Sequence, residues 1–323
     1  MGLELKNPLI ISACSLTRDL AKVKQMEEYG AAAIVLPSLF EEELTYDQAY
    51  IENFTNSFQG FTPEAFDYLP EPEKYNNLDG EEYLENLNKI KKAVSVPVFG
   101  SLNGVGLGGW TKYAKLMQEA GADGIELNIF YIPTDPKLSA NDIENRYIDV
   151  LKKVKSEVSI PVAVKLNPFF SSLANMATKL DTAGADSLVL FNRFLEPDIN
   201  LETLEIDPKL EFSSAIEMRL PLHWSAILYG RVKTSICAGR GVKNAEQMIK
   251  LIMAGADTVS IASVLYQHGL PSIKTILNDA DKWMDENEYT SFNQMRGSMS
   301  YSNLSDPSHL ERLNYMKTIK AFL

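Results

Sequence analysis

Short runs of apolar residues recur along the chain, and each is followed by a longer stretch in which apolar and polar residues alternate with helical spacing. The runs are apolar on both faces, which is typical of buried parallel strands rather than of half-exposed ones. The predicted strands are Leu9–Ala13, Ala33–Leu36, Val96–Phe99, Gly124–Leu127, Ile160–Val164, Ser187–Leu190, Thr234–Ala238 and Thr258–Ile261.

The stretches between these runs predict helices over residues 19–29, 81–94, 107–120, 143–158, 172–183, 222–230, 244–254 and 271–286. Strand and helix alternate eight times, which predicts an α/β fold, the eight-stranded (β/α)8 TIM barrel. A doubly wound open sheet is the alternative fold, but it usually has fewer strands, and no Gly-x-Gly-x-x-Gly motif opens the first predicted helix here.

One phrase is repeated at the ends of three predicted helices. Ala-Gly-Ala-Asp occurs at residues 120–123, 183–186 and 254–257, and a weaker copy stands at residues 29–33. A glycine just after a helix adopts the left-handed conformation that caps it. The small residues around it then let the chain turn tightly into the next strand.

Two predicted connections are longer than ordinary loops. They cover about residues 40–79 after the second strand and residues 194–212 after the sixth, and the tail beyond residue 287 predicts a C-terminal helical extension. Nothing between them resembles a linker, so residues 1–323 are expected to form a single β/α-barrel domain. Long loops after barrel strands often form lids or substrate walls, so segment 40–79 is expected to cover the active site.

Charge narrows the possible partners. The net charge of −12 and the isoelectric point of about 4.9 argue against nucleic acid and anionic membranes as partners. Cys14 and Cys237 lie in apolar runs and are expected to be free buried thiols. Without a visible signal peptide or membrane span, we expect a cytoplasmic protein.

Catalytic residues of a β/α barrel sit at the carboxyl ends of its strands. Here these ends carry amides, hydroxyls and glycines with almost no carboxylates, so neither a metal site nor a glycosidase pair is expected. His223, His268 and His309 fall in or near helices and are expected to serve surface or packing roles.

The last two strand ends predict a phosphate site. Gly239-Arg240-Gly241 follows the seventh strand and Ala262-Ser263 follows the eighth. In β/α barrels these loops often hold a phosphate on backbone N–H groups, and glycine lets the backbone approach the anion closely. The alternative is that the glycines only shape a turn.

Lys165 is a charged residue at the end of the apolar strand Val162-Ala163-Val164. A buried lysine needs a partner. That partner could be an electron-rich ligand, such as a reduced flavin near its N1–C2 edge, or a carboxylate in a structural ion pair. Asn128 and Asn192 could form hydrogen bonds to a heterocycle, although asparagine is also a common turn residue.

Several of these segments resemble the dihydroorotate dehydrogenase family. The matching segments are Asn7–Ala13, Ile125–Asn128, Val162–Leu166, Val189–Arg193, Gly239–Gly241 and Ile261–Ser263, which stand in the family's order. The resemblance extends from Leu5 to about Leu277. It implies a barrel that binds flavin mononucleotide (FMN) and oxidises dihydroorotate to orotate in pyrimidine biosynthesis.

The resemblance also implies roles for individual residues. Tyr131 would be the proton acceptor, and Lys165 the catalytic cation facing the flavin. The expected FMN-binding residues are Ala13, Ser38, Ser101, Asn128, Lys165, Asn192, Ala238, Gly239, Arg240, Gly241, Ala262 and Ser263, and the expected substrate-binding residues are Asn103, Asn128, Asn192 and Arg193. The expected partners are a small-molecule substrate, a soluble electron acceptor such as fumarate, and a second copy in a homodimer.

The substrate half of the site departs from the family's pattern. Tyr131 stands where the family has a Cys or Ser base, Pro37 replaces the lysine after the second strand, and Ala215-Ile216 replaces a glycine pair. A phenol, with a reference pKa of about 10, is a weak base at neutral pH. Two alternatives follow, namely a flavoenzyme of this lineage with another small substrate and a non-catalytic barrel that binds FMN or phosphate.

Overall fold

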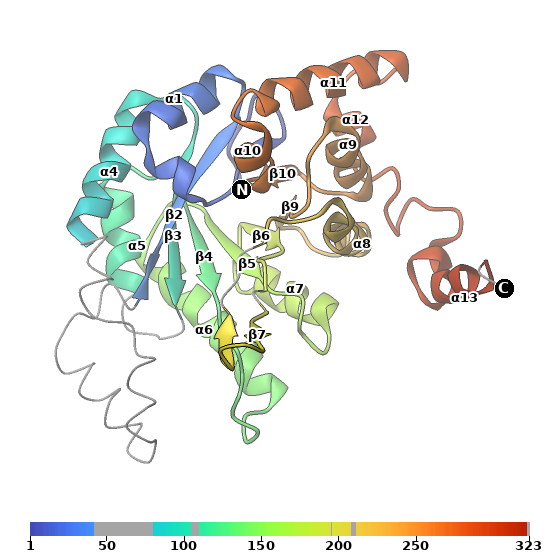
Figure 1. Cartoon of the computed structure of the whole chain (residues 1–323), viewed down its shortest axis with the longest axis horizontal. Coiled ribbons are helices and arrows are strands. Elements are labelled where there is room, and N and C mark those ends of the chain that lie inside the picture. The colour runs from blue at the N-terminus through green and yellow to red at the C-terminus, as the bar shows by residue number, and fades with distance from the viewer. Residues whose placement is uncertain (42–79, 105–109, 195, 208–210, 322–323) are drawn as a thin grey trace.

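The computed structural model describes residues 1–41, 80–104, 110–194, 196–207 and 211–321. Within these ranges eight parallel strands form a closed barrel with helices around it (Figure 1). The (β/α)8 prediction is therefore confirmed. The predicted cover, segment 40–79, lies outside the described residues except for its first two positions and stays a prediction.

The barrel strands and their helices agree closely with the hydrophobic pattern. The strands are β1 (Leu9–Ile11), β2 (Ala33–Phe40), β3 (Val98–Gly104), β4 (Gly124–Ile129), β5 (Val162–Leu166), β6 (Ser187–Leu190), β9 (Ser235–Gly239) and β10 (Thr258–Ile261). The helices between and after them are α1 (Leu20–Glu28), α4 (Gly80–Ala93), α5 (Trp110–Glu119), α6 (Ala140–Glu157), α7 (Leu173–Thr182), α8 (Arg219–Leu228), α9 (Ala245–Ala254), α10 (Ser263–His268) and α11 (Ser272–Glu286).

Side chains alternate between the two faces of the barrel wall. Residues such as Ile125 and Leu127 on β4 point outward into the main apolar core, which fills the space between strands and helices. Some inward positions carry small side chains, for example Ala33 and Ala163. As a result the amino-terminal half of the barrel contains a cavity of about 690 Å³, which the first eight residues help to line.

The three Ala-Gly-Ala-Asp copies form the same junction at the amino-terminal end of the barrel. Their glycines have φ values of +99°, +95° and +124°, as expected for residues that cap a helix. The sequence did not indicate what the aspartates do. Asp123 Oδ2 accepts a hydrogen bond from Val98 N at 2.7 Å, and Asp186 Oδ2 accepts one from Val162 N at 2.8 Å.

Asp257 repeats this arrangement, since its Oδ2 accepts from Ile236 N at 2.8 Å. Each aspartate also donates its backbone N–H to the carbonyl oxygen of the strand residue whose N–H its side chain accepts, at 2.8–2.9 Å. A basic side chain completes each junction, Lys91 on Asp123, Lys155 on Asp186 and Arg296 on Asp257. We name these three junctions the aspartate clamps. Each fixes the register between one strand and the next.

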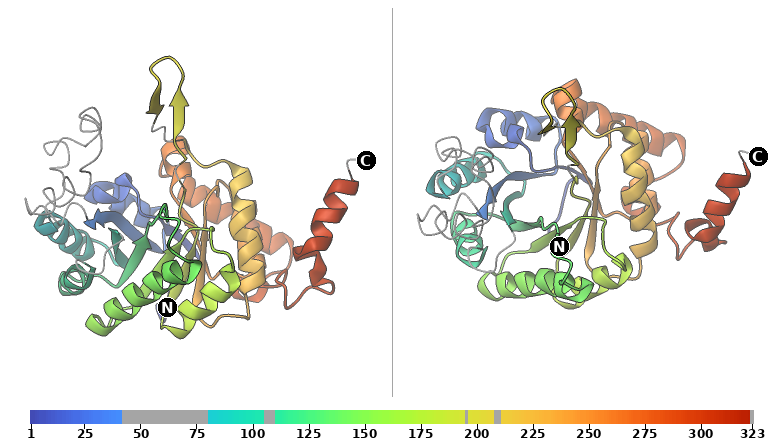
Figure 2. Two further views of the ribbon diagram at one scale, coloured as in Figure 1. Left: turned by 90° about the horizontal axis from the view of Figure 1, so that it is seen from below. Right: turned by 60° about the horizontal axis from the view of Figure 1, so that its bottom comes forward.

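Two of the predicted additions lie within the described residues, namely the insertion after β6 and the C-terminal helical extension, and both are present. After β6 the chain forms an antiparallel hairpin of β7 (Asp198–Asn200) and β8 (Glu205–Asp207), which projects away from the barrel on the side opposite the N-terminus (Figure 2). Beyond α11 lie α12 (Phe292–Met295), η5 (Pro307–Leu310) and α13 (Arg312–Lys320), and α13 stands apart from the barrel wall.

The three histidines and the two cysteines lie in different parts of the fold. His223, His268 and His309 lie on α8, α10 and η5. Cys14 and Cys237 are free thiols; Cys237 is buried as expected, but Cys14 is only partly buried. Burial raises the pKa of Cys237 to about 11. In the ranges described, every helix is too short or too polar to cross a membrane.

The aspartate clamps predict a loss of stability on substitution. Asp186→Ala removes the acceptor for Val162 N and the partner of Lys155, so we expect unfolding in urea to show a loss of about 1–3 kcal/mol. The control is Asp207→Ala on the exposed hairpin, for which we expect a change within about 0.5 kcal/mol. Equal losses in the two variants would contradict a clamping role.

Candidate functional site

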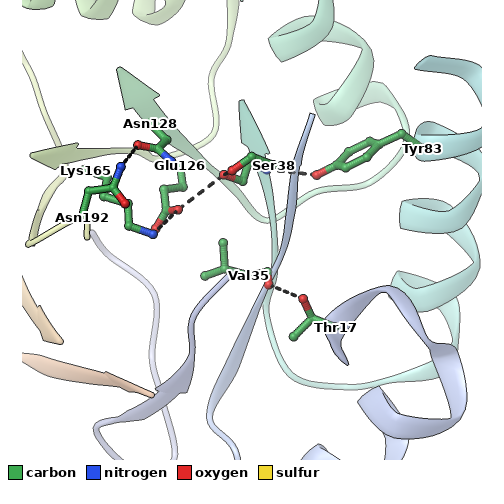
Figure 3. A network of polar contacts seen from close by, with 9 residues as sticks. Thr17, Val35, Ser38, Tyr83, Glu126, Asn128, Lys165 and Asn192 are labelled. Carbon is green, nitrogen blue, oxygen red and sulfur yellow. Dashed lines mark hydrogen bonds and ion pairs between the residues drawn. The ribbon is translucent and has the colours of Figure 1, made fainter. Parts of the chain in front are cut away.

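A buried ion pair lies inside the carboxyl-terminal half of the barrel. Lys165 Nζ on β5 lies 3.3 Å from Glu126 Oε1 on β4, and the two residues are only 9% and 3% exposed (Figure 3). A buried charge without a partner costs several kcal/mol, so each of these residues requires the other. The structural ion pair considered for Lys165 is therefore present, and it places the ammonium group within the barrel.

The pair continues into a hydrogen-bond network toward β2. The Ser101 hydroxyl on β3 lies 3.4 Å from the same Glu126 oxygen and 2.8 Å from the Ser38 hydroxyl on β2. The Tyr83 hydroxyl on α4 accepts from Ser101 N at 3.0 Å, and burial raises the pKa of this phenol. The network thus joins β2, β3, β4 and β5 to α4 (Figure 3).

Two asparagines face each other at the ends of β4 and β6, which are separated by β5. Asn192 Nδ2 donates to Asn128 Oδ1 at 2.6 Å, which joins the end of β6 to β4 across β5. Asn103 is the partner of Asn128 in the β3–β4 register. Amides of this kind offer donors and acceptors side by side, so they match the edge of a heterocycle that carries both.

The Gly239-Arg240-Gly241 turn packs against the insertion that follows β6. Arg240 Nε lies 2.7 Å from Glu217 Oε2, and Glu217 Oε1 accepts from Ser214 N at 2.8 Å. Burial raises the pKa of Glu217, but the Ser214 N–H and the Arg240 guanidinium outweigh it and lower the pKa below its ordinary value. The carboxylate therefore stays charged and holds the turn.

Close packing explains both glycines of this turn. A Cβ on Gly239 would come within 2.2 Å of Ser260 Oγ, and one on Gly241 would lie 2.4 Å from Ser214 O. Arg240 and Gly241 have φ values of +81° and +74°. The predicted neighbours Ala238, Ala262 and Ser263 lie beside the turn, at the end of β9 and the start of α10.

The remaining predicted residues lie around this centre. Ala13 follows β1 and packs onto the cluster of Ala33, Val35 and Phe99 inside the barrel. The next turn is fixed by Thr17, whose hydroxyl donates to Val35 O at 2.9 Å (Figure 3).

Tyr131 contacts a residue of α6. Its ring packs under the guanidinium of Arg146 on α6, with the carbon of that group 4.1 Å from the ring centroid. Arg193 lies near enough to Glu217 to contribute to the lowered pKa of that carboxylate. The structure thus brings together Ser38, Ser101, Asn128, Lys165 and Asn192, but the hydrogen bonds of the described residues do not join Tyr131 to them.

Sequence reasoning missed Glu126, Tyr83 and Glu217. The signal for Glu126 was available, because it lies two residues before Asn128 on a buried strand and so points to the same face. Tyr83 and Glu217 belong to a helix and to the insertion after β6, and their places at the site depend on tertiary packing.

The donor and acceptor set at this mouth fits the ring of a flavin. One ammonium, two amides and two hydroxyls lie on adjacent strands, and the imide edge of a flavin offers two carbonyl oxygens and one N–H. The Arg240 turn lies on the next strands around the barrel.

Comparison with known proteins points in one direction. A model of the family described as dihydroorotate dehydrogenase matches residues 75–284. The chain is 26% identical to the catalytic subunit of dihydroorotate dehydrogenase B (NAD(+)) of Thermoplasma volcanium, over 92% of this chain and 95% of that one. It is 27% identical to the same subunit of Methanocaldococcus jannaschii, over 90% and 93% of the two chains.

The buried ion pair predicts strongly coupled substitutions. Glu126→Leu leaves the Lys165 ammonium buried without its carboxylate, so we expect a loss of about 3–5 kcal/mol in urea unfolding. Adding Lys165→Met should restore most of that loss. The control is Glu85→Leu in the exposed pair with Lys89, where we expect at most about 1 kcal/mol. Additive losses in the double variant would show that the pair is not coupled.

The lowered pKa of Glu217 predicts a pH-dependent stability. A carboxyl group with a lowered folded pKa stabilises the protein above its ordinary pKa, and the stabilisation is lost as pH falls through the folded value. The wild type should therefore exceed Glu217→Gln in stability at neutral pH, with the difference shrinking below about pH 4.3. Unfolding in urea at several pH values measures it, and a difference independent of pH would refute the assignment.

Proposed function

The chain belongs to the dihydroorotate dehydrogenase family, and we propose that it is an FMN-dependent oxidoreductase that acts on a CH–CH bond. One observation carries the cofactor part of this proposal. The Lys165 ammonium is held in the barrel by Glu126, just below the paired amides of Asn128 and Asn192. A fixed cation beside hydrogen-bonding amides suits a ring that becomes electron-rich on reduction.

The proposal divides the mouth of the barrel between the two ends of FMN. Lys165, Asn128 and Asn192 would hold the ring together with Ser38, Ser101 and Ala13. The residues Ala238, Gly239, Arg240, Gly241, Ala262 and Ser263 would hold the phosphate, on backbone N–H groups and the Arg240 side chain. Glu217 keeps that arginine in place.

The family's reaction is the first candidate reaction. Oxidation of dihydroorotate to orotate removes a proton from one carbon and a hydride from its neighbour, and a carbon–carbon double bond forms. Tyr131 is the proposed proton acceptor, and Asn103, Asn128, Asn192 and Arg193 are proposed to orient the substrate. A bound FMN would accept the hydride at N5, and a soluble acceptor such as fumarate would then take up the two electrons.

A second candidate is another small substrate for the same flavin chemistry. The position of Tyr131 favours it, because the ring packs on Arg146 of an outer helix instead of joining the Lys165 network. A phenol is also a weaker base at neutral pH than the thiolate of an activated cysteine. The third candidate is a barrel that binds FMN or phosphate without catalysis. Any turnover of the flavin would exclude it.

The proposed flavoenzyme needs an electron acceptor, and the relatives suggest one. The two relatives are named as catalytic subunits of an NAD(+)-linked enzyme, so NAD⁺ joins fumarate among the acceptors to be tested. We propose a soluble cytoplasmic enzyme, active as a homodimer, with no nucleic-acid or membrane partner. The net charge of −12 supports the last point.

The decisive test is anaerobic mixing of the FMN-loaded protein with dihydroorotate. If the family's reaction is present, the visible flavin band bleaches, and Tyr131→Phe slows bleaching by about 10²-fold or more because the proton acceptor is lost. The control is Tyr315→Phe, since that exposed tyrosine lies on α13 away from the barrel, and it should not change the rate.

The other outcomes separate the remaining readings. A protein that takes up FMN but is not bleached by dihydroorotate has kept the cofactor and changed its substrate. If no reductant or acceptor of small size turns the flavin over, the non-catalytic reading holds. A protein that does not take up FMN would refute the cofactor assignment itself.

A further inference from the structure

Three neighbouring barrel strands end in the same short pattern. Asn-x-Phe stands at the end of β4 at residues 128–130, just after β5 at residues 167–169 and just after β6 at residues 192–194. The three strands are adjacent in the barrel, so the repeated residues lie side by side at the mouth. Asn128 and Asn192 form one tier, and the three phenylalanines form a second tier, each two residues after its asparagine along the chain.

The first tier is the amide pair of Asn128 and Asn192, and further hydrogen bonds around it hold the strand ends in place. Asn192 and Asn128 are joined by their hydrogen bond of 2.6 Å. Asn167 Nδ2 donates to the Tyr147 hydroxyl at 3.0 Å, and Asn167 Oδ1 accepts from Phe169 N at 2.9 Å. The buried Tyr147 hydroxyl donates in turn to Ile129 O at 2.8 Å, so the ends of β4 and β5 are tied together.

The second tier is aromatic. The rings of Phe130 and Phe194 have centroids 6.3 Å apart, so this contact joins the same two strand ends as the Asn128–Asn192 bond. Phe169, from the strand end between them, packs edge-on against Phe194 at 5.0 Å. Each phenylalanine follows its asparagine by two residues, so the aromatic tier lies next to the amides along the chain.

The aromatic tier is open on one side. Phe130 and Phe194 are half-buried, but Phe169 is 66% exposed, and nearby Ile132 is 47% exposed. A phenylalanine this exposed adds little to the core. Its ring is fixed by Phe194 instead, which leaves an apolar surface beside the amide tier that a ligand can contact.

The basic groups described at this mouth already have partners. Lys165 is paired with Glu126, and Arg240 with Glu217, whose carboxylate is also near Arg193. Arg146 lies over the Tyr131 ring. An anionic substrate would therefore gain little from these cations, whereas a neutral ring could use both tiers.

We propose that this site takes an uncharged, planar cyclic amide that carries an apolar or aromatic substituent. The amide edge of the ring bonds to Asn128 and Asn192, and the substituent packs on Phe169 and Phe194. This inference rests on the second candidate of the proposed function, the same flavin chemistry on another small substrate, and names the class of that substrate. It makes Phe169 and Phe194 specificity-determining residues.

The test measures binding of three probes by calorimetry, with and without FMN. The probes are uracil, 5-benzyluracil and orotate, so that only the substituent or the charge changes. We expect 5-benzyluracil to bind at least about 10-fold more tightly than uracil, which matches about 1.4 kcal/mol from one aromatic contact. Orotate should bind no more tightly than uracil.

Two variants locate the effect. Phe169→Ala should remove most of the 10-fold preference for 5-benzyluracil and leave the Kd of uracil unchanged, because only the apolar tier is altered. The control is Phe212→Ala, since that exposed ring stacks on Tyr266 and lies outside the two tiers, and it should keep the preference. Circular dichroism confirms that both variants are folded.

Three results would overturn the proposal: equal affinities for uracil and 5-benzyluracil, a preference for orotate, or a preference that survives Phe169→Ala. Failure of the proposed function gives a different result. A protein that does not take up FMN refutes the flavin assignment, while the calorimetric comparison without FMN still decides whether the aromatic tier selects apolar rings.

Discussion

The ion pair of Glu126 and Lys165 is the interaction on which the mouth of this barrel depends. Two charges inside a barrel are stable only when each neutralises the other, so their strands must keep a register that brings them within reach. Ser101 and Ser38 then extend the pair toward β2, and Tyr83 fixes Ser101 from outside the barrel. The polar groups of the site are therefore held by the barrel wall as well as by loops.

The hydrophobic pattern was sufficient to predict the barrel, and pairing between strands accounts for what it missed. Apolar runs and capping glycines are local signals, so strands and helices could be read from them. The aspartates of the repeated phrase could not be interpreted, because each bonds to a residue on the preceding strand, about 21–25 positions earlier in the chain. Lys165 was recognised as requiring a partner, but that partner, Glu126, is 39 positions away.

The polar half of the site was easier to predict than the half around Tyr131, because strands fix the positions of side chains and loops do not. Lys165 and Asn128 lie on strands and Asn192 lies just after one, so their positions follow from the fold, and the structure brings them together as expected. Tyr131 lies in the loop before α6, where the hydrophobic pattern gives no direction for a side chain. Its ring packs on Arg146 and, among the described residues, is not hydrogen-bonded to the Lys165 network. The neighbouring phenylalanines make this half of the site apolar, whereas the asparagines make the other half polar.

The aspartate clamps have a consequence for how such a protein can diverge. They lie at the amino-terminal end of the barrel, and the residues proposed to contact ligands lie at the carboxyl-terminal end. Stability and selectivity are thus encoded in separate parts of each strand-and-helix unit. Loops at the ligand end can accumulate mutations without loosening the clamps. The same segregation makes the barrel a suitable scaffold for grafting recognition loops from relatives, one strand end at a time.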